Sequence, residues 1–465
     1  MSAASLGLMG SAIGTLRHIQ PLRIVGRIVT LRGLTVHVSD LPLPCGAVVQ
    51  IQRPALDDQP MLGEVVGFDA GLTVVMMLGQ SAGLRPGDRV VGLGATPTVP
   101  VGDAMLGRVI NGLGEAIDEL GPMHGLRSRL LMPEPMRALA RKRVTEPVRT
   151  GLRAIDVMTP LGRGQRLGIF AGPGVGKSTL LGSLARNSDC DVAVLALIGE
   201  RGREVKDFVQ EVLGQAGLER AVVIAATGDE SALMRVRAAN LAFSVAEHFR
   251  DSGKHVLLLL DSLTRFCHAH RQIGLATGEP PTTKGYTPGV FAALSRLLER
   301  AGQLETPPGA PQQGSITGLF TILVEGDEMT EPVSDAARGI LDGHLVLSRK
   351  LAQRNHYPAI DVLDSVSRVA ADVSDPEHDM ARRQLGRLMA NYKDVEELVQ
   401  IGAYAKGSNV DSDVAIAMHP RIRDLLQQGT RDREPWATTR SRILKIVGDA
   451  AAQAATSQAG QPRRS

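Results

Sequence analysis

The spacing of apolar residues changes twice along the chain and so divides it into three parts. Between residues 21 and 98, short runs rich in Val, Ile and Leu are separated at close intervals by Gly and Pro. This rhythm predicts a small antiparallel β-barrel, because short strands joined by tight turns are typical of that architecture. The runs that carry the prediction are Leu22–Leu31, Gly46–Gln52, Leu62–Val66 and Leu72–Leu78.

Residues 99–372 have a different pattern, in which short apolar runs alternate with longer helical segments. That alternation predicts a mainly parallel sheet covered by helices. The expected strands are Leu167–Phe170, Val192–Ile198, Val222–Ala225, Val256–Leu260 and Leu319–Val324.

Residues 373–450 are expected to form a helical domain, because apolar residues recur there at spacings of three and four. The expected core positions of its first part are Met380, Leu385, Leu388, Met389, Tyr392, Val395 and Leu398. Residues 451–465 are mostly Ala, Gln, Ser and Arg, and this composition predicts a frayed, disordered tail.

The first 20 residues form a separate segment with one apolar stripe. Leu6, Met9, Ile13 and Leu16 recur at helical spacing and predict a helix over residues 5–17 that docks on a partner or a membrane surface. The glycines among them weaken such a helix by roughly 1 kcal/mol each. A flexible N-terminus without a docking helix therefore remains the alternative.

Composition excludes several classes of protein. Of the 465 residues, 43% are hydrophobic and 22% are charged, which is enough apolar material for a sizeable core. The 52 basic and 49 acidic residues nearly balance, so net charge does not indicate a nucleic-acid binder. The three cysteines lie far apart without a CxxC pair, which argues against a disulfide framework. Since no apolar run approaches 18 residues, we expect a soluble cytoplasmic protein.

One segment does concentrate positive charge. Residues 127–153 hold eight basic side chains opposed only by Glu134 and Glu146. They are Arg127, Arg129, Arg137, Arg141, Lys142, Arg143, Arg149 and Arg153. Such a run can bind a polyanion, but it is more often a solvated connecting segment, which is the interpretation favoured for this chain.

The clearest chemical motif is a glycine-rich loop between an apolar strand and an amphipathic helix. It consists of Gly172, Pro173, Gly174, Val175, Gly176, Lys177, Ser178 and Thr179. Glycines let backbone N–H groups curl around phosphate oxygens, and the helix N-terminus adds a favourable dipole. The motif is therefore a P-loop, in which Lys177 would reach the β- and γ-phosphates and Ser178 would bind Mg²⁺. Ala171 stands where the strict pattern opens with glycine.

Two further apolar strands end in an acid, and both ends should lie at the same sheet edge as the phosphates. Asp261 follows the run that begins at His255 and is expected to be the second Mg²⁺ ligand. Glu200 ends the strand that begins at Asp191 and could orient and deprotonate the attacking water. From position alone, Glu200 could equally form a surface ion pair with Arg201 or Arg203.

Longer motifs resemble a known family. The segments Ile198-Gly-Glu-Arg-Gly-Arg-Glu204, Asp261-Ser-Leu-Thr-Arg265 and Pro358-Ala-Ile-Asp-Val-Leu-Asp-Ser-Val-Ser-Arg368 are similar to the rotary ATP synthase catalytic subunits. The segments Gly278-Glu-Pro-Pro281, Arg296–Gly302, Glu325-Gly-Asp327 and Glu331–His344 resemble more closely the flagellar protein-export ATPases and their injectisome relatives. The resemblance runs from about residue 21 to 447. The synthase subunits' acidic lever motif is not found in the C-terminal region, which reads His419-Pro-Arg-Ile-Arg-Asp-Leu-Leu-Gln-Gln428.

The resemblance implies roles for individual residues. Glu200 matches the family's catalytic carboxylate, and Arg201 and Arg265 match two arginines on the γ-phosphate side, for which a structural ion pair is the alternative. Tyr357 matches a tyrosine near adenine, although it could instead be a core tyrosine. Arg368 matches the arginine finger that acts across a subunit interface, and a salt bridge within one subunit is its alternative.

The resemblance also implies an architecture and a function. The fold expected is an α/β P-loop (RecA-like) core with an N-terminal antiparallel β-barrel domain and a C-terminal helical domain. The activity expected is Mg²⁺-dependent ATP hydrolysis by a homohexamer that energises protein export through a flagellar type III apparatus, with an injectisome ATPase as the alternative. Implied partners are export-apparatus regulator and gate proteins and chaperone–cargo complexes. The implied location is the cytoplasm, peripheral at the inner face of the cytoplasmic membrane.

Two other classes of function are less well supported. An RNA-dependent hexameric translocase needs aromatic platforms for stacking bases, yet Phe68 is the only aromatic residue among residues 1–100. No nucleic-acid partner is therefore expected. A non-catalytic nucleotide-binding ring subunit should lack the catalytic carboxylate, yet Glu200 is present.

Overall fold

The computed structural model describes residues 23–52, 61–94, 96–306, 313–324, 331–430 and 432–459. The expected docking helix at residues 5–17 and the Glu325–Asp327 segment lie outside the described residues. Contacts divide the chain into two compact units. The first is built mainly from residues up to Thr98, and the second contains most of the remaining chain.

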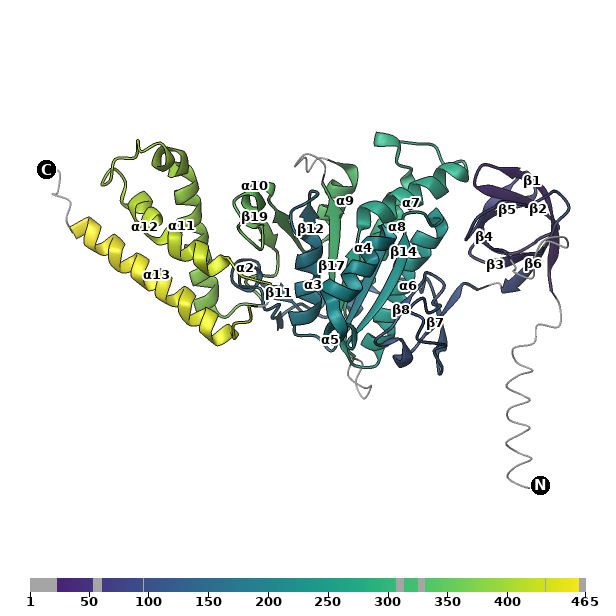
Figure 1. The fold of residues 1–465 in the computed structure, drawn as a ribbon, viewed down its shortest axis with the longest axis horizontal. Coiled ribbons are helices and arrows are strands. Elements are labelled where there is room, and N and C mark those ends of the chain that lie inside the picture. The colour runs from purple at the N-terminus through teal and green to yellow at the C-terminus, as the bar shows by residue number, and fades with distance from the viewer. Residues whose placement is uncertain are drawn as a thin grey trace, which may run out of the picture. The chain divides into compact units, whose positions relative to one another are not determined.

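The first unit contains a closed barrel of six antiparallel strands, as the sequence predicted (Figure 1). Its order is β1-β2-β5-β4-β3-β6. The strands are β1 (Val25–Arg32), β2 (Thr35–Ser39), β3 (Val48–Gln52), β4 (Met61–Asp69), β5 (Leu72–Met77) and β6 (Arg89–Gly94). Val and Ile side chains such as Val38, Val49 and Val75 are fully buried and form the barrel core.

The second unit is built on a sheet with the order β19-β18-β12-β17-β15-β13-β14-β8. Every neighbouring pair in that order is parallel except β18 and β19. The central strands are buried along almost their whole length, as is typical of parallel sheets covered on both faces. All five strands predicted in this region are present. The strands are β8 (Val109–Ile110), β12 (Arg166–Ala171), β13 (Val192–Glu200), β14 (Ala221–Thr227), β15 (His255–Asp261), β17 (Ser315–Leu323), β18 (Gly343–Leu347) and β19 (Ile360–Ser367).

Helices connect these strands. The helices are α2 (Arg153–Met158), α3 (Lys177–Asn187), α4 (Gly202–Asp207), α5 (Gly214–Leu218), α6 (Ala232–Asp251), α7 (Leu263–Ala276), α8 (Pro288–Leu298), α9 (Pro332–Ile340) and α10 (Arg349–Gln353). A π-helical turn at Phe208–Leu213 lies between α4 and α5. Short strands complete the region: β7 (Thr98–Val101), β9 (Arg127–Leu130), β10 (Pro147–Val148), β11 (Leu161–Gly162) and β16 (Gly302–Gln303).

Three helices form the C-terminal part: α11 (Pro376–Gln400), α12 (Val410–Leu426) and α13 (Trp436–Ala459), which pack against one another (Figure 1). Side-chain caps begin the first two helices, because Asp375 accepts from the His378 N–H and Asn409 accepts from the Ser412 N–H. None of the helices in the described ranges is long and apolar enough to cross a bilayer.

Two expectations about this region need correction. The disordered tail expected from residue 451 is wrong for its first part, because α13 continues to Ala459; alanine and glutamine there favour the helix. Residues 460–465 lie outside the described residues. In α11, Leu385 and Leu388 are buried as expected, but Met380 and Leu398 are 60% and 45% exposed because they lie off the packed face.

The basic segment does not form a polyanion patch, since most of its side chains have acidic or aromatic partners in the same unit. The ion pairs are Arg129–Asp251, Arg141–Glu299, Lys142–Glu146, Arg143–Asp372 and Arg153–Glu434. The Arg149 guanidinium stacks 3.8 Å from the ring centre of Trp436 in α13. These contacts agree with the connecting-segment interpretation.

Candidate nucleotide-binding and hydrolysis site

The predicted P-loop begins directly after β12. Its last three residues, Lys177, Ser178 and Thr179, are the first residues of α3. Gly174 and Gly176 have φ values of 76° and 87°, a left-handed conformation that glycine adopts without strain. A Cβ atom placed on Gly176 would lie 3.4 Å from Cε1 of Tyr357, so the tyrosine ring is close to the loop. Ala171 is still within β12 and paired on both sides, so the departure from glycine falls before the turn. The local geometry is that of a phosphate-binding loop.

Four charged side chains from three segments converge beside this loop. The Lys177 ammonium lies 2.6 Å from Oδ1 of Asp261 and 3.3 Å from Oε1 of Glu200. The Arg265 guanidinium lies 2.5 Å from the same Glu200 oxygen. Both carboxylates are at the ends of parallel strands, β13 and β15, where ligands of such sheets collect. The structure thus brings together residues that are up to 88 positions apart in the sequence.

The electrostatic environment keeps Glu200 ionised. Burial of its carboxylate opposes ionisation, but the hydrogen bond from Arg265 and the charge of Lys177 outweigh it, and the pKa of Glu200 is lowered. Neighbouring Glu204 has a raised pKa, chiefly because it shares a hydrogen bond with Glu200. The site therefore holds a buried carboxylate that is charged at neutral pH.

The donor set beside the loop suits a hard divalent cation. Asp261 supplies a carboxylate whose position is fixed by a 2.7 Å hydrogen bond from the Thr321 hydroxyl. Ser178 supplies a hydroxyl from the first turn of α3. Oxygen ligands of this kind are what Mg²⁺ prefers. The Lys177 ammonium lies between the two carboxylates. Their negative charges therefore favour positive charge at this place.

Other predicted site residues are not part of this cluster within a single chain. The Arg201 side chain is 86% exposed and pairs with Glu204 at 3.6 Å. Arg368 follows β19, is exposed, and donates from Nη2 to the carbonyl of Arg338. Tyr357 is 40% exposed, so the alternative of a core tyrosine is wrong.

Sequence analysis missed Thr321, whose hydroxyl holds Asp261. The available signal was that Thr321 is one of three hydroxyl residues, with Ser315 and Thr317, in the mainly apolar strand Ser315–Leu323. That signal is weak, because a buried threonine usually satisfies its hydroxyl on the backbone.

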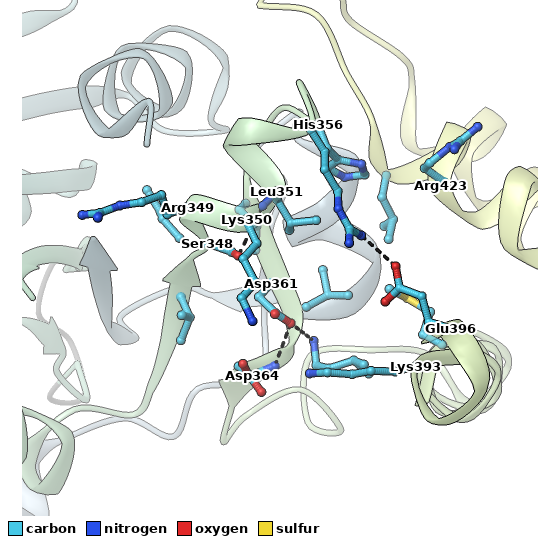
Figure 2. A pocket seen from close by; sticks show the side chains of 18 of the residues that line it. Ser348, Arg349, Lys350, Leu351, His356, Asp361, Asp364, Lys393, Glu396 and Arg423 are labelled. Atoms are coloured by element: carbon cyan, nitrogen blue, oxygen red, sulfur yellow. Dashed lines mark hydrogen bonds and ion pairs between the residues drawn. The ribbon is translucent and has the colours of Figure 1, made fainter. Parts of the chain in front are cut away.

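A separate cavity of about 1140 Å³ lies between the β18–β19 segment and helices α11 and α12 (Figure 2). Of the P-loop, only Gly172 reaches its wall. An ion pair of 2.8 Å between Arg354 and Glu396 joins its two sides. Glu396 is labelled in Figure 2. His419 stacks on Tyr392 in the same wall, with ring centres 3.5 Å apart. This cavity is distinct from the charged cluster beside Lys177.

Comparison with known proteins agrees with this geometry. The model of the ATP synthase alpha/beta family, nucleotide-binding domain, matches residues 151–367. The model of the T3SS EscN ATPase C-terminal domain matches residues 374–445. Together the two matches cover the P-loop region and the C-terminal helices.

Relatives cover nearly the whole chain. A flagellum-specific ATP synthase of Treponema pallidum is 49% identical, over 94% of this chain and 96% of its own. A type 3 secretion system ATPase of Xanthomonas euvesicatoria is 45% identical, over 92% and 95%. The assembled ATPase EscN of the enteropathogenic E. coli type III secretion system has a TM-score of 0.83 and 41% identity, over 91% of this chain and 100% of its own. EscN has also been solved in complex with its central stalk, EscO.

Proposed function

The chain belongs to the family of flagellum-specific ATP synthases and type III secretion ATPases, and from this premise we propose that its ATP hydrolysis energises protein export through a flagellar type III apparatus. The observation that carries the proposal is the convergence of Lys177, Glu200, Asp261 and Arg265 beside the P-loop. This arrangement would place a cation that binds phosphate, a general base and a metal ligand close together. The alternative, export through an injectisome, is favoured by relatives such as the Xanthomonas ATPase.

The proposed chemistry is displacement at the γ-phosphate of ATP by water. The backbone N–H groups from Gly174 to Thr179 and the Lys177 ammonium hold the β- and γ-phosphates. Glu200 accepts a hydrogen bond from the attacking water and takes its proton as the new P–O bond forms. The bond from the γ-phosphorus to the β,γ-bridging oxygen breaks in the same displacement, and ADP leaves with its electron pair. When phosphate enters, Lys177 exchanges its contact with Glu200 for one with the phosphate, which leaves the carboxylate free to act on water.

Ser178 and Asp261 are proposed to hold Mg²⁺. When bound, the ion neutralises charge that develops on the phosphate oxygens. Thr321 keeps the Asp261 carboxylate oriented toward that position. Arg265 is proposed to act on the γ-phosphate side and, through its bond to Glu200, to orient the base.

Arg201 and Arg368 are proposed to act at an interface between subunits of a homohexamer. Both are exposed in the single chain. Exposure suits Arg368 to enter a neighbour's site as an arginine finger, and Arg201 to meet the γ-phosphate side when that interface forms. Tyr357, which is near Gly176 and partly exposed, is proposed to lie beside the adenine base.

The proposed partners follow from the family. A ring of this chain is proposed to assemble with a central stalk protein, because the assembled relative EscN has been solved in complex with its central stalk, EscO. Export regulators, the export gate and chaperone–cargo complexes are proposed to meet it at the cytoplasmic face of the membrane. Peripheral membrane contact through residues 1–20 belongs to the same proposal.

The test is to replace the chromosomal gene with a Glu200→Gln variant and to measure export in the source organism. Glu211→Gln is the matched control, because Glu211 is an exposed carboxylate on the turn after α4. The proposal expects flagellar export proteins to remain in the cell with Glu200→Gln and to be exported normally with the control. Loss of injectisome secretion with intact flagellar export would show that the protein is an injectisome ATPase, which is the alternative. Normal export of both kinds would contradict the proposal.

A further inference from the structure

The loop that carries Tyr357 is held from the C-terminal end of α12. The Gln428 backbone N–H donates to the Tyr357 carbonyl at 2.8 Å. The side chain of the preceding residue, Gln427, donates to the Asn355 carbonyl at 3.0 Å. The two consecutive glutamines that follow α12 therefore contact the backbone on either side of His356.

The side chain of Gln428 is itself held by a distant part of the chain. Its Oε1 accepts from the Arg153 backbone N–H at 2.9 Å, and its Nε2 donates to the Gly151 carbonyl at 2.8 Å. The same nitrogen donates to the Asp432 carbonyl at 2.9 Å. Gln428 is only 7% exposed, so water does not compete for these bonds. Its carboxamide is fully engaged, and this fixes where its backbone N–H points.

The turn that anchors Gln428 lies beside the end of the P-loop helix and is held by Asp156 of α2. Gly151 has a φ of 71°, and a Cβ placed on it would lie 3.1 Å from Cβ of Asn187, the last residue of α3. The buried Asp156 carboxylate accepts the N–H groups of Thr150 and Gly151 at 2.8 and 3.0 Å. The turn at 150–151 is thus held by Asp156 of α2 and lies beside one end of α3, while the Tyr357 ring lies near Gly176 at the other end of α3.

We propose that Gln428 is a positioning residue, which holds Tyr357 over the P-loop so that the tyrosine ring meets the nucleotide base. The inference rests on the proposed role of Tyr357 and extends it to a residue of the C-terminal helical region. Gln428 acts through Tyr357 and does not itself touch the nucleotide. It links the turn at Gly151 to the Tyr357 carbonyl and sets the distance between the ring and Gly176.

The proposal separates ATP binding from the chemical step. Loss of the Gln428 carboxamide leaves Lys177, Glu200, Asp261 and Arg265 in place, so kcat should change little. Recognition of the base should weaken, and KM for ATP should rise roughly fivefold, the effect of about one lost hydrogen bond. Because GTP has the same triphosphate and a purine face of the same kind, KM for GTP should rise together with KM for ATP.

The experiment compares Gln428→Ala, Tyr357→Ala and the double variant with Gln384→Ala as the matched control. Gln384 is an exposed glutamine on α11, outside the site. Steady-state ATP and GTP hydrolysis gives kcat and KM for each. Emission from Trp436, the single tryptophan, reports whether the C-terminal helices remain packed. If Gln428 acts through Tyr357, the double variant should have the KM of Tyr357→Ala, and the control should match the parent.

The possible outcomes are distinguishable. A raised KM in Tyr357→Ala with an unchanged KM in Gln428→Ala would overturn the positioning inference and leave the role of Tyr357 standing. An unchanged KM in Tyr357→Ala would remove the proposed role of Tyr357, and the inference with it. Additive effects in the double variant, or loss of the folded Trp436 emission with kcat and kcat/KM falling together, would assign Gln428 a merely structural role.

Discussion

At the scale of single residues, the site is a balanced set of buried charges. Lys177 and Arg265 face Glu200 and Asp261 within hydrogen-bonding distance, so two positive charges compensate two negative ones. Removing one partner from such a set leaves an uncompensated buried charge, which costs more than the pair contributes. Effects on folding must therefore be separated from effects on catalysis when these residues are changed.

Lys177→Ala and Glu200→Gln should abolish turnover by different routes. Losing Lys177 removes a charged phosphate contact, so nucleotide affinity should fall by roughly tenfold or more. Losing the Glu200 base should lower kcat by about 10²–10⁴ while nucleotide affinity is kept. Equilibrium nucleotide binding measured beside turnover checks both statements. Full turnover in Glu200→Gln would show that Glu200 is not the catalytic base.

Asp156 gives a pH prediction. Burial, opposed by hydrogen bonds from Thr150, raises its pKa to about 6. Because the folded-state pKa is raised, the contribution of Asp156 to stability is present below its unfolded pKa and is lost as pH rises through about 6. The unfolding free energy of the parent relative to Asp156→Asn should thus fall by up to about 3 kcal/mol between pH 4 and 7. Urea unfolding of both proteins over that pH range measures this difference in unfolding free energy. A free-energy difference that is constant or grows with pH would contradict the raised pKa of Asp156.

At the scale of elements, α11 shows how packing selects among positions of one apolar stripe. Leu385 is fully buried against the core of the second unit, whereas Met380 is 60% exposed. Helical spacing alone places both residues on candidate core positions. Only the tertiary partners of the helix decide which of them is covered.

Leu385→Ala should destabilise the protein by about 2–5 kcal/mol, the cost of a cavity in a packed core. Met380→Ala, on the same helix, should change stability by less than about 0.5 kcal/mol. Thermal or chemical unfolding of the two variants side by side checks the pair. Similar losses from both substitutions would show that the packed face of α11 is assigned wrongly.

The elements also show what a sequence can and cannot predict. The central strands and the P-loop were predictable because each is a contiguous pattern whose backbone requirements are local. The strand ends that carry Glu200 and Asp261 followed from the rule for parallel sheets. Thr321 and Gln428 were not predictable, since their importance comes from contacts made 60 or more positions away. Helix α13 extended beyond its expected end because composition alone does not separate a polar helix from a tail.

At the scale of the whole molecule, we propose that a second subunit completes the hydrolysis site. Within the described part of the chain, the Arg368 side chain donates to the Arg338 carbonyl and remains exposed. The charge that develops on the transferred phosphoryl group needs a further cation, and an arginine finger typically contributes about 10³–10⁵ in rate. We therefore expect Arg368 of one subunit to act at the site of its neighbour in a ring.

The central claim, an ATP hydrolase whose site is completed by Arg368 of a neighbour, is tested most directly by turnover of mixed rings. Arg368→Ala and Lys177→Ala subunits should each be inactive alone. In mixtures, an intact P-loop from the first can meet an intact Arg368 from the second, so activity should partly return and should rise with protein concentration as rings assemble. Mixed rings that demonstrably form, yet hydrolyse no more ATP than either pure variant, would contradict the claim.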